Sequence, residues 1–122
     1  MGLFGGNKDK SYDTSKLEAE IKPFLMVGEE IEKIYPLIIS YFCITNKRFI
    51  FTVKYIGKDE DESFYTIPHK NVVSVGYIKN HTKFINTSDI SIDTAAGKYL
   101  VQFAKGITDA QEVYNEIMKK II

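Results

Sequence analysis

The sequence predicts a mainly β (α+β) fold, a barrel of about seven antiparallel strands capped by a C-terminal helix, with a short N-terminal helix. Short runs of β-branched and aromatic residues follow one another from about residue 30 to about residue 103, separated by turn-forming residues. An amphipathic helical pattern follows the last run. A chain of 122 residues can hold one hydrophobic core, so we expect a flexible tail, residues 1–12, and a single domain, residues 13–122.

The short N-terminal helix is predicted from its capping and stop signals. Ser15 and Glu18 have the spacing of a capping box, which indicates that a helix begins there. Pro23 removes a backbone donor and Gly28 follows it, so the helix should end within residues 22–25. Beyond that point the chain should become extended.

The strands are predicted from alternation and turn chemistry. Asn46 and Lys47 separate two apolar runs by two residues, which indicates a tight hairpin because Asn tolerates positive φ. The acidic run 59–62 is typical of another turn, and the polar stretch 80–88 should be the least regular connection. The seven predicted strands are residues 30–35, 38–45, 48–55, 63–67, 72–79, 89–94 and 98–103.

The C-terminal helix is predicted to close the open end of the barrel. Thr108 and Gln111 have the spacing of a second capping box. Five apolar residues then recur on one helical face, and a barrel end offers the surface that can bury them. They are Ala110, Val113, Tyr114, Ile117 and Ile121.

Composition excludes several partner classes. Sixteen Lys and Arg balance sixteen Asp and Glu, so overall charge gives no case for binding nucleic acid or an anionic membrane. Cys43 is the only cysteine and cannot form an internal disulfide, which fits a reducing compartment. No apolar stretch is long enough for a transmembrane helix, and the apolar N-terminus is too short for a signal peptide. We therefore expect a cytoplasmic protein.

Residues that could carry chemistry are few and scattered. Cys43 lies among large apolar residues, which predicts a buried thiol with a raised pKa rather than a nucleophile. His69 and His81 have no metal-ligand spacing, so both are expected at the surface. The acidic run 59–62 could collect a divalent cation, but a solvated turn is the better interpretation. We predict no catalytic residue, no metal and no cofactor.

Aromatic residues beside two cations leave one further alternative. Lys47 and Arg48 lie near aromatic side chains of the kind that can stack on single-stranded nucleic acid. The same aromatic residues serve equally well as barrel core, and the cations are too few for a nucleic-acid surface. These aromatic residues are Tyr41, Phe42, Phe49 and Phe51.

Several local strings resemble those of bacterial pleckstrin-homology (PH) domains. Thr45-Asn46-Lys47-Arg48 is similar to the family's second hairpin, and Gly28-Glu29-Glu30 to its entry into the first strand. Residues 65–70 resemble the end of its fourth strand, and residues 103–109 the entry to its last helix. The resemblance covers roughly residue 15 onward and departs from the family over residues 77–91, which are polar and irregular.

The resemblance implies a PH-like barrel with no known catalytic chemistry, an undefined cellular role, and assembly into symmetric homo-oligomeric rings. The loop between the first two strands contains no Lys or Arg, so a phosphoinositide headgroup would lack its main binding energy. The apolar character of this loop instead suits burial against another protein. The predicted function is a non-enzymatic, self-associating interaction module with an unknown protein partner, and the alternative is a peripheral lipid-surface binder. The candidate interface residues are Tyr35, Pro36, Leu37, Ile38 and Ile39.

Overall fold

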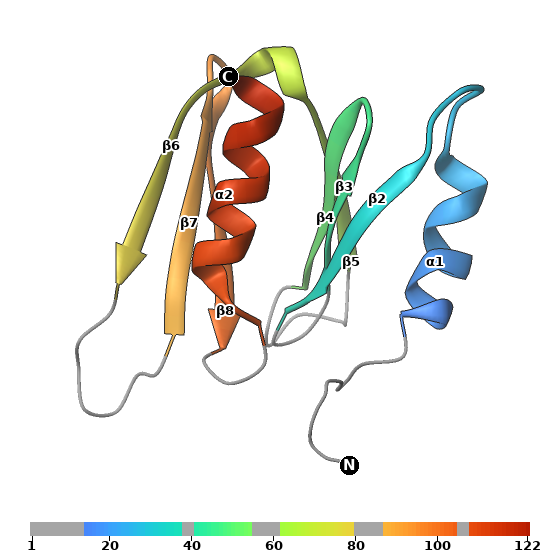
Figure 1. Ribbon diagram of the computed structural model, residues 1–122, viewed down its shortest axis with the longest axis horizontal. Helices are drawn as coiled ribbons and strands as arrows, with labels where there is room; N and C mark the ends of the chain where they lie inside the picture. Colours follow the sequence, from blue (N-terminus) through green and yellow to red (C-terminus); the bar gives the residue numbers. More distant parts are fainter. Residues whose placement is uncertain (1–13, 38–40, 55–61, 80–86, 105–107) are drawn as a thin grey trace.

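Seven antiparallel strands form two sheets in a computed structural model (Figure 1) that describes residues 14–37, 41–54, 62–79, 87–104 and 108–122. The first sheet has the order β2-β3-β4-β5 and the second the order β6-β7-β8. The predicted strands are confirmed with shifts of a few residues at their ends. The first sheet consists of β2 Ile31–Pro36, β3 Tyr41–Thr45, β4 Arg48–Lys54 and β5 Glu62–Pro68. The remaining elements are α1 Ser15–Ile21, η1 Lys22–Phe24, η2 His69–Asn71, β6 Val72–Lys79, β7 Thr87–Thr94, β8 Gly97–Ala104 and α2 Ala110–Ile121.

The core lies between the two sheets and α2. In β4, Phe49 and Phe51 face the core, and in β7, Ile90 and Ile92 do so. Alternation along each strand therefore buries one face of each sheet. The aromatic residues beside Lys47 and Arg48 are core residues, because all four side chains are buried. The predicted stripe of α2 is also confirmed: Ala110, Val113 and Ile117 are buried, and Tyr114 and Ile121 pack against the same core.

Side chains at both ends of α2 bond to β2, the edge strand of the first sheet. Near the start of α2, Thr108 Oγ1 donates a hydrogen bond of 2.8 Å to the carbonyl oxygen of Pro36. Tyr35 of β2 donates a hydrogen bond of 3.0 Å from its Oη to Oε2 of Glu112, in the first turn of α2. At the other end of α2, Lys120 forms an ion pair with Glu32 of β2. These contacts engage an edge that would otherwise invite pairing with another strand.

Both predicted capping boxes were wrong in their N-cap residue. The N-cap of α2 is Asp109, whose side chain accepts a hydrogen bond from the backbone N–H of Gln111. Thr108 is unavailable as a cap because its hydroxyl bonds to β2. The N-cap of α1 is Thr14 rather than Ser15, and its side chain makes no capping hydrogen bond. The stop signal was right, since α1 passes into η1 at Lys22.

Helix α1 packs on the outer face of the first sheet. Ile21 is fully buried there against Tyr41, Cys43 and Ile50, which form a second apolar cluster behind the main core. Figure 1 shows α1 beside the first sheet and α2 against the second. Because α2 lies on the inner side, no helix in the described ranges covers the outer face of β6-β7-β8.

Candidate interaction surface

A buried ion pair organises the end of the molecule where α1 passes into β2. The guanidinium of Arg48 donates to the carboxylate of Glu29, from Nε to Oε2 at 2.7 Å and from Nη2 to Oε1 at 2.9 Å. Glu29 comes from the turn before β2, and Arg48 begins β4. Arg48 Nη2 also donates to the carbonyl oxygen of Phe24 at 2.6 Å. One arginine thus joins the turn, the sheet and the end of η1.

The carboxylate of Glu29 has further donors that keep it charged. Thr45 Oγ1 donates to Oε2 at 2.6 Å, and the backbone N–H of Met26 donates to Oε1 at 3.0 Å. Burial by itself would raise the pKa of Glu29, but the hydrogen bonds from Arg48, Thr45 and Met26 outweigh burial and lower that pKa to about 2. Glu29 is therefore ionised throughout the physiological range and fixed to the fold.

The hairpin residues lock the turn from the other side. Asn46 Nδ2 donates to the carbonyl oxygen of Gly28 at 3.0 Å, and Asn46 Oδ1 accepts from the backbone N–H of Glu30 at 2.8 Å. Gly28 has a φ of 81°, which other residues adopt only with strain, so the turn requires glycine. The two strings that carry the family resemblance therefore meet in space, and most of their side chains are structural.

This network presents exposed apolar side chains to solvent. Val27 is 99% exposed and Met26 67%, although both are large apolar residues. Phe24 is half exposed, and its ring lies 4.6 Å from the ring of Phe64 on β5. We call these four residues, Phe24, Met26, Val27 and Phe64, the apolar patch. Met26 and Val27 follow Phe24 closely along the chain. Exposed apolar residues that are held on a rigid network are typical of protein interaction sites.

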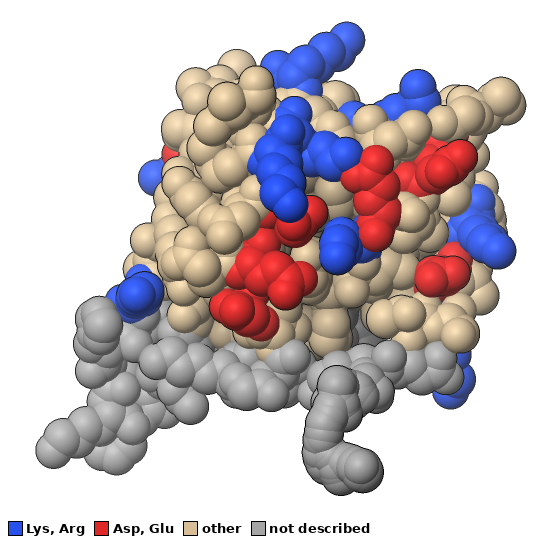
Figure 2. All heavy atoms as spheres, viewed as in Figure 1, with Lys and Arg blue, Asp and Glu red and all other residues tan. Residues whose placement is uncertain are grey.

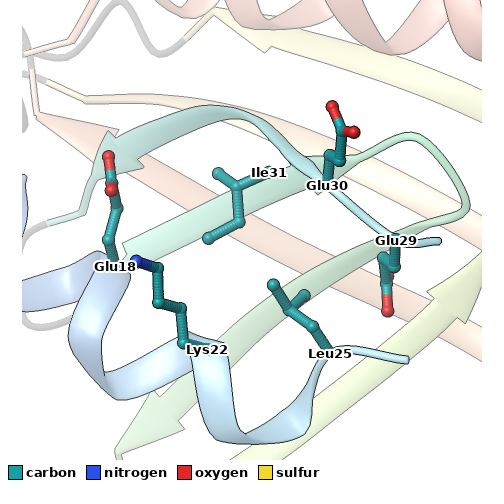
Figure 3. Close-up of a pocket in the computed structure, with 6 residues that line it drawn as sticks. All are labelled: Glu18, Lys22, Leu25, Glu29, Glu30 and Ile31. Atoms are coloured by element: carbon teal, nitrogen blue, oxygen red, sulfur yellow. The ribbon is translucent and has the colours of Figure 1, made fainter. Parts of the chain in front are cut away.

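A shallow open groove adjoins the apolar patch (Figure 3). Its volume is about 290 Å³. Figure 3 shows Leu25 and Ile31 between Glu18 and Lys22 on one side and Glu29 and Glu30 on the other, with Lys22 extending back toward Glu18. Its mixed, open lining lacks the enclosed apolar walls that hold a small molecule, so the groove favours contact with a protein surface.

Charges of both signs are mixed over the face that carries α2 (Figure 2). In the described part of the chain, the ion pairs with Glu or Asp are those of Arg48, Lys119 and Lys120. Several of the other Lys residues that the structure describes, Lys47 and Lys70 among them, have no such ion pair. Lys47 adjoins the apolar patch because its neighbour Asn46 bonds to Gly28. The backbone N–H of His69 donates to the carbonyl oxygen of Lys47 at 3.3 Å, which brings Lys70 to the same end.

The interface residues predicted from the sequence have different environments. Tyr35 is buried in the core and bonded to Glu112, and Leu37 packs against the core from its edge. Pro36 is half-buried at the end of β2. Ile38 and Ile39 lie outside the described residues. As an interface, this segment remains a prediction.

The residues considered for chemistry are located in the core or at the surface. Cys43 is fully buried, and burial raises the pKa of its thiol to about 12, as expected. His69 was expected at the surface but is half-buried, with its ring 4.5 Å from that of Phe49. His81 and residues 59–61 fall outside the described residues. Over the described ranges, no three His, Cys, Asp or Glu residues are grouped to hold a metal ion.

Sequence reasoning missed the Glu29–Arg48 pair and the apolar patch. The available signal was the two charged strings themselves, because a Glu and an Arg that flank apolar runs can pair across a hairpin. The exposure of Met26 and Val27 carries no sequence signal, since nothing local separates an exposed apolar residue from a buried one.

No helix in the described part of the chain has the length and apolar character needed to cross a membrane.

The arrangement of a four-stranded and a three-stranded antiparallel sheet with a C-terminal helix defines a PH-like fold. Solved structures share it. A PH domain from Shewanella amazonensis SB2B is 22% identical and has a TM-score of 0.76, covering 93% of this chain and 92% of that one. A DUF1696 family protein with a PH domain from Shewanella loihica PV-4 is 19% identical with a TM-score of 0.71, covering 91% of this chain and 95% of that one.

The chain belongs to the bacterial PH domain family, whose model matches residues 5–121. It is also similar to the uncharacterized protein YozO of Bacillus subtilis (strain 168), with 34% identity over 122 residues that cover 99% of this chain and 98% of that protein. The family resemblance read from the sequence is therefore confirmed. These relatives are not a known enzyme family.

Proposed function

We propose that this PH-like domain is a non-enzymatic interaction module that self-associates through the apolar patch. The observation that carries the proposal is the exposure of Phe24, Met26 and Val27 on a network that fixes their backbone. Because the network is already ordered in the single chain, contact through this surface loses little backbone entropy. Burial of such side chains provides the favourable free energy of association.

A non-catalytic role is supported by the burial of Cys43 and by the hydrogen bonds that occupy the carboxylate of Glu29. The thiol of Cys43 is buried with a pKa near 12, so its thiolate is scarce at neutral pH. The carboxylate of Glu29 is saturated with donors and cannot act as a general base. The groove beside the apolar patch is open and shallow, which disfavours exclusion of water from a reaction.

Light scattering coupled to size exclusion tests the proposal. We expect the wild-type chain to elute as a species whose mass is a multiple of 14.0 kDa at micromolar concentration, and to dissociate on dilution. A single species of 14.0 kDa over a hundredfold range of concentration would contradict self-association. Because closed assemblies of identical chains are usually symmetric, the copy number should be constant once saturated.

A peripheral membrane role is the second candidate, favoured by the exposed Met26 and Val27 beside the unpaired Lys47. Apolar tips flanked by cations are features of shallow interfacial binding. Co-sedimentation with phosphatidylserine vesicles separates the two candidates. Sedimentation that weakens with salt and is lost on Val27→Glu would favour the membrane, whereas protein that stays in the supernatant with its assembled mass favours self-association.

A further inference from the structure

A histidine with an unsatisfied ring nitrogen lies where the two sheets and α2 meet. His69 begins η2, the turn that joins β5 of the first sheet to β6 of the second. Its backbone N–H donates to the carbonyl oxygen of Lys47 at 3.3 Å, which ties η2 to the hairpin of β3 and β4. The C-terminal end of α2 lies beside this turn (Figure 1), and α2 contacts η2. A change at His69 can therefore reach both sheets and the helix.

The ring of His69 packs on the core. Its centroid is 4.5 Å from that of Phe49, which is fully buried. The side chain of His69 hydrogen-bonds to the backbone of Arg48. The Nε2 atom is buried and has no hydrogen-bond partner in the described part of the chain. We therefore assign the bond to Nδ1, so the neutral ring has its proton on Nδ1 and none on Nε2.

Protonation of this ring creates a buried donor without an acceptor. The second proton binds to Nε2, and a buried charged donor that lacks an acceptor is destabilising. Burial is the largest cause that lowers the pKa of His69, and the charge of Lys120 on α2 acts in the same direction. The bond to Arg48 and the charges of Glu32 on β2 and Glu29 before β2 act against it. The folded chain therefore favours the neutral ring.

Of the two acids that act on the ring, Glu32 is the one that can change its partner. The carboxylate of Glu29 is occupied by Arg48 and Thr45 and is buried. Glu32 is partly exposed and forms its ion pair with Lys120. A protonated His69 would attract Glu32 and repel Lys120, so it would weaken this ion pair from both sides. The other cations next to the ring in sequence, Lys47 and Lys70, are exposed, and solvent screens their charges.

The Lys120–Glu32 ion pair joins the last turn of α2 to β2. The first turn of α2 is held independently, by the bonds from Thr108 to Pro36 and from Tyr35 to Glu112. Loss of the ion pair would therefore free the last turn and leave the first turn in place.

We propose that His69 is an acid-sensitive latch, whose protonation releases the last turn of α2 from β2. Release admits water to Nε2 and frees Glu32 to pair with the charged ring. In the released state His69 titrates near its ordinary pKa of about 6.5. At pH 5.5, one unit lower, proton binding should raise the population of the released state by up to about tenfold. The latch acts within one chain and does not depend on self-association.

Amide hydrogen exchange of the full chain at pH 7.5 and 5.5, resolved by residue with NMR, tests the latch. The protection factors of the backbone amides of Lys120 and Ile121, each taken relative to an unstructured peptide at the same pH, should fall by up to about tenfold at the lower pH. Their exchange should not respond to low concentrations of urea, because a local opening exposes little surface. Exchange that urea accelerates would show that acid acts on the whole fold and would overturn the latch. Amides already unprotected at pH 7.5 would overturn it too.

Three variants identify the sensor and the contact that it controls. His69→Gln cannot titrate and should keep both protection factors within about twofold between the two pH values. His81→Gln removes the other histidine of the chain and should respond to acid like the wild type. A response in His69→Gln equal to that of the wild type would overturn His69 as the sensor. Glu32→Gln, at a partly exposed site that tolerates the change, removes the ion pair and should lower both protection factors already at pH 7.5. Wild-type protection in Glu32→Gln would overturn the ion pair as the contact that is released.

Discussion

Replacing Arg48 by Met should destabilise the fold more than any single change at an exposed ion pair. The side chain of Glu29 is 1% exposed and that of Arg48 is 18% exposed, so the substitution leaves a carboxylate buried without its main partner. Breaking such a pair from one side costs about 3 to 5 kcal/mol. With a urea dependence of about 1 to 3 kcal/mol/M, the midpoint should fall by roughly 1 to 5 M, which equilibrium unfolding followed by circular dichroism measures readily.

Acid should have a related effect on the wild type. The pKa of Glu29 is lowered from 4.5 to about 2 in the folded chain, so its contribution to stability is complete above pH 4.5 and is lost as the pH falls toward 2. The difference corresponds to about 3 kcal/mol. Glu29→Gln should remove this pH dependence while lowering stability at pH 7.

The matched control is Lys119→Met, which breaks an exposed pair with Glu116 in which the Lys is 68% exposed. Exposed pairs contribute about 0 to 1 kcal/mol, so its midpoint should barely move. If Arg48→Met and Lys119→Met shifted the midpoint equally, the Glu29–Arg48 pair would not be the element that holds this end of the fold together.

Three further predictions concern the core and its titratable groups. Ile117→Ala should cost about 2 to 5 kcal/mol because Ile117 is fully buried, and an unchanged urea midpoint would remove α2 from the core. Burial lowers the pKa of His69, and the charge of Lys120 acts in the same direction, while Glu32 and Glu29 act against it. The Nε2 atom of His69 is buried without a hydrogen-bond partner among the described residues. The contribution of neutral His69 to folding stability is therefore present above about pH 6.5 and is lost as the pH falls. The free energy of unfolding should drop more between pH 7.5 and 5.5 in the wild type than in His69→Gln. Cys43 should react with iodoacetamide at pH 8 far more slowly in the native state than in urea, and equal rates would show that its thiol is accessible.

The sequence was sufficient to predict the strands and the final helix because their signals are local. Alternation marks β4, and the 3.6-residue period marks α2. The caps were misplaced because Thr108 and Asp109 are equally good N-cap residues by type. The choice between them depends on the bond from Thr108 to Pro36, which lies 72 residues away in sequence.

The candidate site was less predictable for a related reason. The partners Glu29 and Arg48 are 19 residues apart, and only the folded hairpin brings them into contact. The apolar neighbours of Tyr35 give no sign of which side of the strand it faces, and alternation along β2 turns its side chain to the core. Exposure of Met26 and Val27 follows from the turn at Gly28, which is a property of the tertiary structure.

We propose that exposed apolar residues on a rigid network drive association between copies of this chain. The most direct test is the molar mass of the wild type and of the double variant Met26→Glu/Val27→Glu by sedimentation equilibrium at the same micromolar concentration. We predict a multiple of 14.0 kDa for the wild type and 14.0 kDa for the double variant, with equal urea midpoints. An assembled double variant of the same mass as the wild type, or a wild type of 14.0 kDa, would contradict the claim.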